Sequence, residues 1–191
     1  MIISLEGLPG SGKSTTARLL GEQPDLEYWH ERSSEHPFLE AFYRDIPRYT
    51  FETELCFLLL HYHQYRDLSP NDATVLDYSP VKDLVFADLN LRGNDHEIFS
   101  TVYQRTSGSL PIPDLAIYLD PDLELVMERI AHRGRSFERD IQPEYLSRLG
   151  EAYKRREGEL GRRVERIQVT AAMSREEVAE TVLAVVQTTS D

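Results

Sequence analysis

A stretch of nine residues near the start of the chain has the types and spacing that bind phosphate. Gly7, Gly12, Lys13 and Ser14 match the pattern of a glycine, four residues, and then Gly-Lys-Ser/Thr. Glycines let the backbone turn successive N–H groups toward one phosphate, and the start of a helix behind them adds further donors. Lys13 would reach the outer phosphates and Ser14 would bind Mg²⁺. We therefore expect ATP with Mg²⁺ to contact Gly7, Leu8, Pro9, Gly10, Ser11, Gly12, Lys13, Ser14 and Thr15.

Two carboxylates follow apolar runs that read as strands. Asp77 comes directly after the run 73–76, where a carboxylate beside the phosphate-binding loop can hold Mg²⁺; an ordinary turn aspartate is the alternative. Glu31 follows the run 26–30 and would lie near the outer phosphate. It could accept the proton of an attacking hydroxyl, or it could be a surface carboxylate paired with Arg32.

Four arginines, Arg129, Arg133, Arg135 and Arg139, cluster around Gly134. Guanidinium groups bind phosphate through several donors, so a loop at about 133–140 would close as a lid over ATP, with Arg129 and Arg133 binding it. The alternative is a solvated basic face paired with neighbouring acidic residues.

Strand and helix patterns alternate along the chain and position these residues. We expect strands at 1–5, 26–30, 73–76, 115–119 and 164–169, and helices at 14–20, 37–43, 48–66, 81–91, 95–105, 123–132, 143–160 and from Ser174 onward. A turn is expected at 45–47, Gly93 should end a helix, and Glu177 stands at capping-box spacing from Ser174. The alternation predicts one α/β domain over 1–191, with a five-stranded parallel sheet flanked by helices. Ligands bind such sheets at the carboxyl ends of the strands.

Composition narrows the classes of partner. The net charge of −12 disfavours a nucleic-acid polymer, whose backbone needs a basic face. The single cysteine, Cys56, lies in an apolar run and excludes an internal disulfide. No apolar run reaches the length of a membrane span, and no signal peptide precedes the first strand, so a cytoplasmic enzyme is expected.

Five stretches together resemble the deoxynucleoside kinase family, in particular its bacterial deoxyadenosine/deoxyguanosine kinase branch. The similarity covers nearly the whole chain. The stretches are 7–15, 31–43, 48–55, 77–87 and 129–138.

The resemblance implies roles for individual residues. Glu31 matches the general base, Tyr43 and Glu138 match residues that bond the sugar 3′-hydroxyl, and Glu54 and Asp83 match residues of the base pocket. The lid would comprise Arg129, Arg133 and Arg135.

Two positions depart from the family pattern. Tyr78 stands where many members have arginine, and His61 stands where an arginine often accompanies the base-pocket aspartate. Stabilisation of the transition state would then depend on Arg32, Lys13, Arg133 and Arg135.

The predicted function is ATP-dependent phosphorylation of a purine deoxynucleoside at its 5′-hydroxyl, in deoxynucleotide salvage. Deoxyguanosine is favoured over deoxyadenosine because an ionised Glu54 can only accept hydrogen bonds. Two alternatives stay open: a nucleoside monophosphate kinase of the thymidylate type, for which Arg32 and Arg48 could bind the acceptor phosphate, and a non-catalytic nucleotide-dependent regulator. The apolar content of 48–66 and 81–91, with the resemblance, predicts a homodimer.

Overall fold

A computed structural model of the chain describes residues 1–68, 73–135, 138 and 141–190. Five strands form one sheet in the order β2-β3-β1-β4-β5, and every neighbouring pair is parallel. The strands are β1 (Ile2–Glu6), β2 (Glu27–Trp29), β3 (Thr74–Leu76), β4 (Leu115–Pro121) and β5 (Arg163–Val169). The predicted five-stranded parallel sheet is therefore confirmed.

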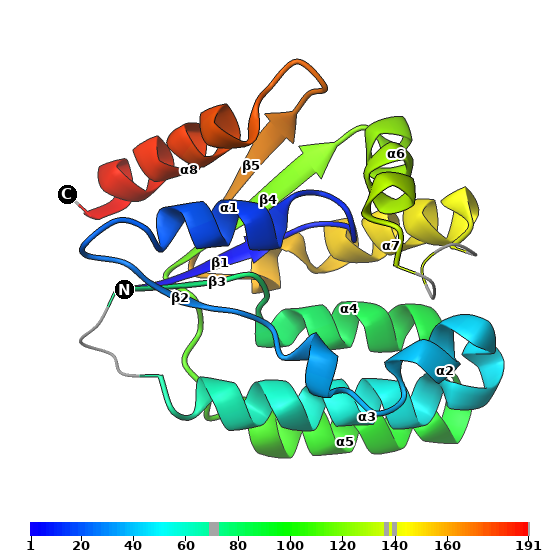
Figure 1. Cartoon of the computed structure of the whole chain (residues 1–191). Helices are drawn as coiled ribbons and strands as arrows, with labels where there is room; N and C mark the ends of the chain where they lie inside the picture. Colours follow the sequence, from blue (N-terminus) through cyan, green and yellow to red (C-terminus); the bar gives the residue numbers. More distant parts are fainter. Residues whose placement is uncertain (69–72, 136–137, 139–140, 191) are drawn as a thin grey trace.

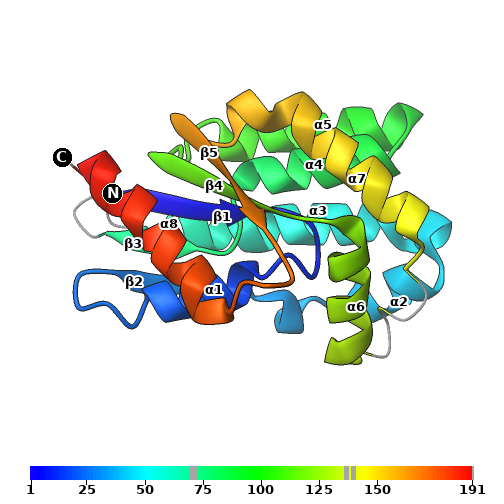
Figure 2. The ribbon, with the colours of Figure 1, turned by 90° about the horizontal axis from the view of Figure 1, so that it is seen from above.

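Helices cover both faces of this sheet (Figure 1). They are α1 (Lys13–Leu20), α2 (Leu39–Arg44), α3 (Ile46–Tyr65), α4 (Pro80–Asn90), α5 (Gly93–Ser107), α6 (Leu123–Arg133), α7 (Pro143–Arg156) and α8 (Arg175–Ser190), with short 3₁₀ turns at Ser33–Glu35 and Glu157–Glu159. Helices α1 and α8 lie side by side on one face, as both views show (Figures 1 and 2). Helices α4 and α7 pack together on the opposite face, and α3 and α5 lie beyond α4.

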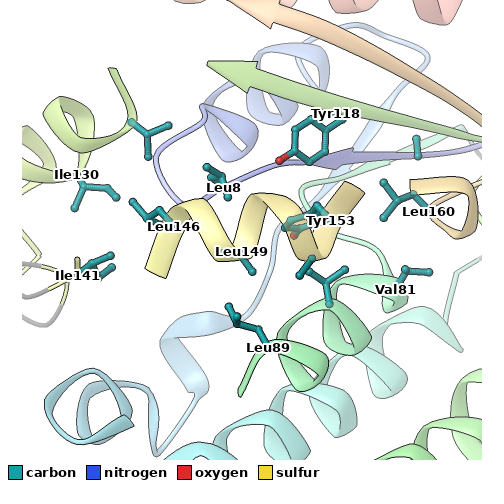
Figure 3. Packing of buried hydrophobic residues seen from close by; sticks show 14 residues of the cluster. Leu8, Val81, Leu89, Tyr118, Ile130, Ile141, Leu146, Leu149, Tyr153 and Leu160 are labelled. Carbon is teal, nitrogen blue, oxygen red and sulfur yellow. The ribbon is translucent and has the colours of Figure 1, made fainter. Parts of the chain in front are cut away.

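The core is divided between the two faces. Every residue of β1 is buried, as expected for a central strand covered on both sides. On the face covered by α1 and α8, Leu5 and Leu20 pack with Val182. On the other face, Leu149 and Tyr153 of α7 pack with Tyr118 of β4 and with α4, and the cluster reaches Leu8 in the phosphate-binding loop (Figure 3). The loop is thus anchored directly in the core.

Three sequence expectations about element boundaries have clear outcomes. Pro47 lies in the first turn of α3 rather than in a preceding turn, because proline is well suited to a position whose N–H has no helical partner. Gly93 begins α5 instead of ending α4, with a φ of 54°. The capping box is confirmed, since Glu177 N donates to Ser174 Oγ at 3.1 Å and Ser174 N donates to Glu177 Oε2 at 2.7 Å.

Within the described ranges, no helix is long and apolar enough to cross a membrane.

Candidate active site

The phosphate-binding loop connects the end of β1 to the start of α1. Gly7 has a φ of 136°, and a Cβ there would lie 2.6 Å from the carbonyl oxygen of Leu119, so only glycine fits. Gly12 precedes α1 in the left-handed region, with a φ of 109°. Lys13 Nζ donates to the carbonyl oxygens of Gly7 and Leu8, both at 2.9 Å. The lysine is therefore folded back along the loop that would cradle the phosphates.

The loop forms one end of a cavity of about 970 Å³ at the carboxyl end of the sheet. The cavity extends past the ends of β2 and β3 to residues of α3, α4 and α6. Most residues singled out in the sequence line it: Gly7, Pro9, Gly10, Ser11, Gly12, Lys13, Ser14, Thr15, Glu31, Tyr43, Glu54, Asp77, Asp83, Arg129, Arg133, Arg135 and Glu138. The fold thus brings side chains from widely separated segments to one space large enough for two small ligands.

Three of the residues expected at the site do not line this cavity. Leu8 is buried in the core and contributes only its carbonyl oxygen, to Lys13. Arg32 is partly exposed, and its Nε lies 3.8 Å from Glu35 Oε1. His61 is buried behind the cavity wall, where its ring stacks on Tyr78 with centroids 4.1 Å apart. The expectations that Arg32 stabilises transferred charge and that His61 faces the base are not supported by these positions.

Glu31 lies at the centre of a network of charged groups. Its backbone N–H donates to Asp77 Oδ1 at 2.8 Å, and its Oε1 accepts a hydrogen bond from Lys82 Nζ. His61 Nε2 lies 3.2 Å from the same Glu31 oxygen, and His61 Nδ1 lies 2.7 Å from Asp83 Oδ1. Two cationic side chains therefore contact the carboxylate proposed as a base.

This network shifts the ionisation of its members. Burial alone would raise the pKa of Glu31, but Lys82 and His61 oppose burial and hold it well below its usual range. Burial alone would lower the pKa of His61, but the carboxylates of Asp83 and Glu31 raise it to about 9. Burial, reinforced by Lys82, lowers the pKa of Lys13 to about 8. At neutral pH, Glu31 is consequently an anion between cations.

The far end of the cavity is lined by the rings of Phe57 and Phe86 together with Glu54 and Asp83. Glu54 Oε1 accepts a hydrogen bond from Asn90 Nδ2 at 2.8 Å. Burial raises the pKa of Glu54 to about 8 despite this bond. A pKa of about 8 favours the protonated form at neutral pH, whereas the sequence argument for deoxyguanosine assumed an ionised Glu54.

The arginines of the expected lid make contacts within the protein. Arg129 Nη1 donates to the carbonyl oxygen of Ser11 at 3.1 Å, against the phosphate-binding loop. Arg133 Nε donates to Glu138 Oε2 at 2.9 Å, and Arg135 Nη1 donates to Glu138 Oε1 at 3.4 Å. Glu138 is buried between them. The fourth arginine of the cluster, Arg139, lies outside the described residues.

The residues expected to hold Mg²⁺ fit a shared site with phosphate. Ser14 and Asp77 both line the cavity, and each Asp77 oxygen accepts one hydrogen bond, from Glu31 N–H and from the Tyr28 hydroxyl, which leaves lone pairs for a cation. In the described part of the chain, no three His, Cys, Asp or Glu side chains converge on one metal position. This donor set suits Mg²⁺, which takes few protein ligands and completes its shell with phosphate oxygens and water.

Lys82 is a site residue that the sequence interpretation missed. It lines the cavity and contacts Glu31, although it had been assigned no role. A signal was present, because Lys82 lies in the first turn of α4, where the positive end of the helix dipole disfavours a cation. Because a lysine in the first turn of a helix is electrostatically unfavourable, its presence there indicates that an anion lies nearby.

Comparisons with known proteins agree with this geometry. Residues 3–187 match the family model described as deoxynucleoside kinase. The chain is 31% identical over 157 residues to a deoxyguanosine kinase of Bacillus subtilis, covering 80% of this chain and 76% of that one. It is 33% identical over 157 residues to a deoxyadenosine kinase of Dictyostelium discoideum, covering 79% of this chain and 64% of that one.

A similar solved structure is that of a deoxyadenosine kinase from M. mycoides with bound dATP. Its TM-score is 0.83 at 22% identity, and the match covers 98% of this chain and 99% of that one. At this level of identity, the likeness concerns the fold.

Proposed function

Because the chain belongs to the deoxynucleoside kinase family, we propose that it transfers the γ-phosphate of ATP to the 5′-hydroxyl of a purine deoxynucleoside, in deoxynucleotide salvage. The observation that carries this proposal is the single cavity that joins the phosphate-binding loop, Glu31 and a pocket of aromatic and carboxyl side chains. A phosphate donor and a nucleoside can therefore meet at Glu31.

The roles of the residues follow from where they lie. The loop and Lys13 would hold the outer phosphates of ATP, and Arg129, Arg133 and Arg135 would approach from α6 and the segment after it. Glu31 would orient the 5′-hydroxyl and accept its proton as the new P–O bond forms and ADP leaves. Tyr43 and Glu138 line the same space and would bond the sugar.

Ser14 and Asp77 would hold Mg²⁺ between the protein and the phosphates of ATP. When bound, the ion neutralises charge on the phosphate oxygens. Asp77 also fixes the backbone at Glu31, because it accepts the Glu31 N–H at 2.8 Å.

Glu54 and Asp83 support a purine as the base, and the matches to a deoxyguanosine kinase and a deoxyadenosine kinase support the same class. A protonated Glu54 offers one donor and one acceptor, which complement N1 and the 6-amino group of adenine. An ionised Glu54 only accepts, which complements the adjacent N–H donors of guanine. We therefore infer that protonation of Glu54 sets the preference between the two bases.

The structure gives no support to the alternative of a nucleoside monophosphate kinase. Arg32 and Arg48, the two residues that left this alternative open, do not line the cavity. Arg32 pairs with Glu35, and the Arg48 guanidinium lies 5.5 Å from the centre of the Tyr49 ring.

We also propose that the chain forms a homodimer through α3 and α5. Helix α4, expected to contribute to the dimer, is packed against α3, α5 and α7 of its own chain. The exposed large apolar residues on helices are Leu59 of α3 and Ile98 of α5.

Two variants test the proposed roles. Lys13→Ala should weaken both ATP binding and turnover, because its charge faces the phosphates. Glu31→Gln should lower kcat for deoxyguanosine and deoxyadenosine by roughly 10²- to 10⁴-fold while the nucleoside still binds. Steady-state kinetics with calorimetric binding measurements separate the two effects. Near-normal turnover in Glu31→Gln would remove Glu31 as the base.

A further inference from the structure

The three lysines of this chain are distributed unevenly. Lys13 and Lys82 line the cavity, whereas Lys154 is exposed and pairs with Glu151. Burying a lysine is costly unless an anion compensates it. The burial of Lys13 is explained by its role in the phosphate-binding loop. The burial of Lys82 requires a separate explanation.

The burial of Lys82 is compensated by its contact with the Glu31 carboxylate. Its Nζ donates to Glu31 Oε1, and the side chains are only 15% and 17% exposed, respectively. The ammonium also lies 5.5 Å from the centre of the Phe57 ring and 5.7 Å from that of Phe86, within range of a cation–π interaction. The lysine is thus held between two aromatic rings of the pocket with its charge on the carboxylate.

His61 contacts the same carboxylate from behind. Its Nε2 lies 3.2 Å from Glu31 Oε1, while its Nδ1 is tied to Asp83 Oδ1 at 2.7 Å. Tyr78, which stacks on His61, is turned away, because its hydroxyl donates to Gln64 Oε1 at 2.8 Å.

We propose that Lys82 is a positioning residue, which holds one oxygen of Glu31 and so directs the carboxylate into the cavity. The inference rests on the proposed function, in which Glu31 is the base. Lys82 holds one oxygen of Glu31, so the other oxygen is presented to the acceptor hydroxyl in a fixed direction.

The direct test compares kcat and KM for deoxyguanosine and deoxyadenosine in the wild-type protein and in Lys82→Met, with calorimetric binding of each nucleoside measured alongside. In Lys82→Met, kcat at neutral pH should fall by about 10- to 100-fold, because the base is misoriented, while KM and nucleoside binding should change little. Lys82→Arg should restore most of kcat, because it keeps a cation that can hold Glu31.

Lys154→Met is the matched control, because it removes an exposed lysine that does not line the cavity, and it should change neither kcat nor KM. If Lys82→Met does not fold, Lys82→Gln replaces it and should give the same loss of kcat. A double variant with Glu31→Gln should be no slower than Glu31→Gln alone, since Lys82 acts through Glu31.

The inference is overturned if kcat is unchanged in the uncharged variant, or if the losses in the double variant multiply. Failure of the proposed function looks different, because the wild-type protein itself then transfers no phosphate to nucleosides.

Discussion

At the scale of single residues, the cavity combines two kinds of carboxyl group whose ionisation is set in opposite directions. Glu31 has two cations in contact, and its pKa lies well below the usual range. Glu54 accepts its hydrogen bond from the neutral amide of Asn90, and burial raises its pKa to about 8. The two carboxyls can therefore do different chemistry in one cavity at neutral pH.

A pH-dependent base preference follows from Glu54. Below its pKa of about 8, Glu54 is protonated and complements adenine; above that pKa it is ionised and complements guanine. The ratio of kcat/KM for deoxyguanosine to that for deoxyadenosine should therefore rise between about pH 6.5 and pH 8.5. Because an unpaired buried polar group costs about 1–3 kcal/mol, the rise should approach tenfold.

Glu54→Gln provides the control for this prediction. A glutamine keeps one donor and one acceptor at every pH, so the ratio in the variant should be flat over the same range. A flat ratio in the wild-type protein would show that Glu54 does not read the base in this way.

Residue types and motif spacing located the phosphate-binding loop, Glu31 and Asp77, whereas Tyr43, Glu54, Asp83 and Glu138 were named from the family resemblance. The loop glycines, Glu31 and Asp77 were identified because a parallel sheet places the ends of its strands together. The partners of these residues were not predictable. Lys82 reaches Glu31, and Arg133 reaches Glu138, only through side-chain directions that sequence spacing does not define. The protonation of Glu54 depends on burial, which likewise arises only in the folded chain.

At the scale of elements, the apolar runs predicted the existence of strands and helices better than their ends. The runs at 73–76 and 115–119 correspond to Thr74–Leu76 and Leu115–Pro121. Pro47 was assigned to a turn and Gly93 to the end of a helix, although each stands at the start of a helix. Proline suits that position because its missing N–H has no helical partner there. The capping box at Ser174 was predictable because its two reciprocal bonds are local.

The proposed dimer depends on two helices, α3 and α5. Leu59 on α3 is 49% exposed and Ile98 on α5 is 41% exposed, which favours pairing through these two helices. Light scattering at micromolar concentration should give twice the mass of the chain, and the double change Leu59→Asp with Ile98→Asp should give the mass of one chain.

Ile112→Asp serves as the control, because Ile112 is 57% exposed but lies outside these helices. It should leave the dimer intact. A wild-type mass corresponding to one chain would exclude the dimer altogether.

At the scale of the whole molecule, the sheet order β2-β3-β1-β4-β5 explains how the site is assembled. Strand β1, at the centre, leads into the phosphate-binding loop, and its neighbour β3 ends directly before Asp77. Strand β2 follows on the far side of β3 and leads to Glu31, so the groups for the phosphate donor and for the acceptor occupy adjacent strand ends. The alternation of elements predicted a parallel sheet, but it did not define this order.

The central claim is that the cavity directs the phosphate of ATP to a nucleoside hydroxyl, and the most direct measurement follows where that phosphate goes. The protein would be incubated with γ-labelled ATP and, separately, with the four deoxynucleosides and their 5′-monophosphates, and the labelled products would be identified. The account predicts label in the 5′-monophosphates of deoxyguanosine and deoxyadenosine, with the pyrimidine nucleosides well behind. Label appearing in nucleoside diphosphates, or only in inorganic phosphate, would contradict it.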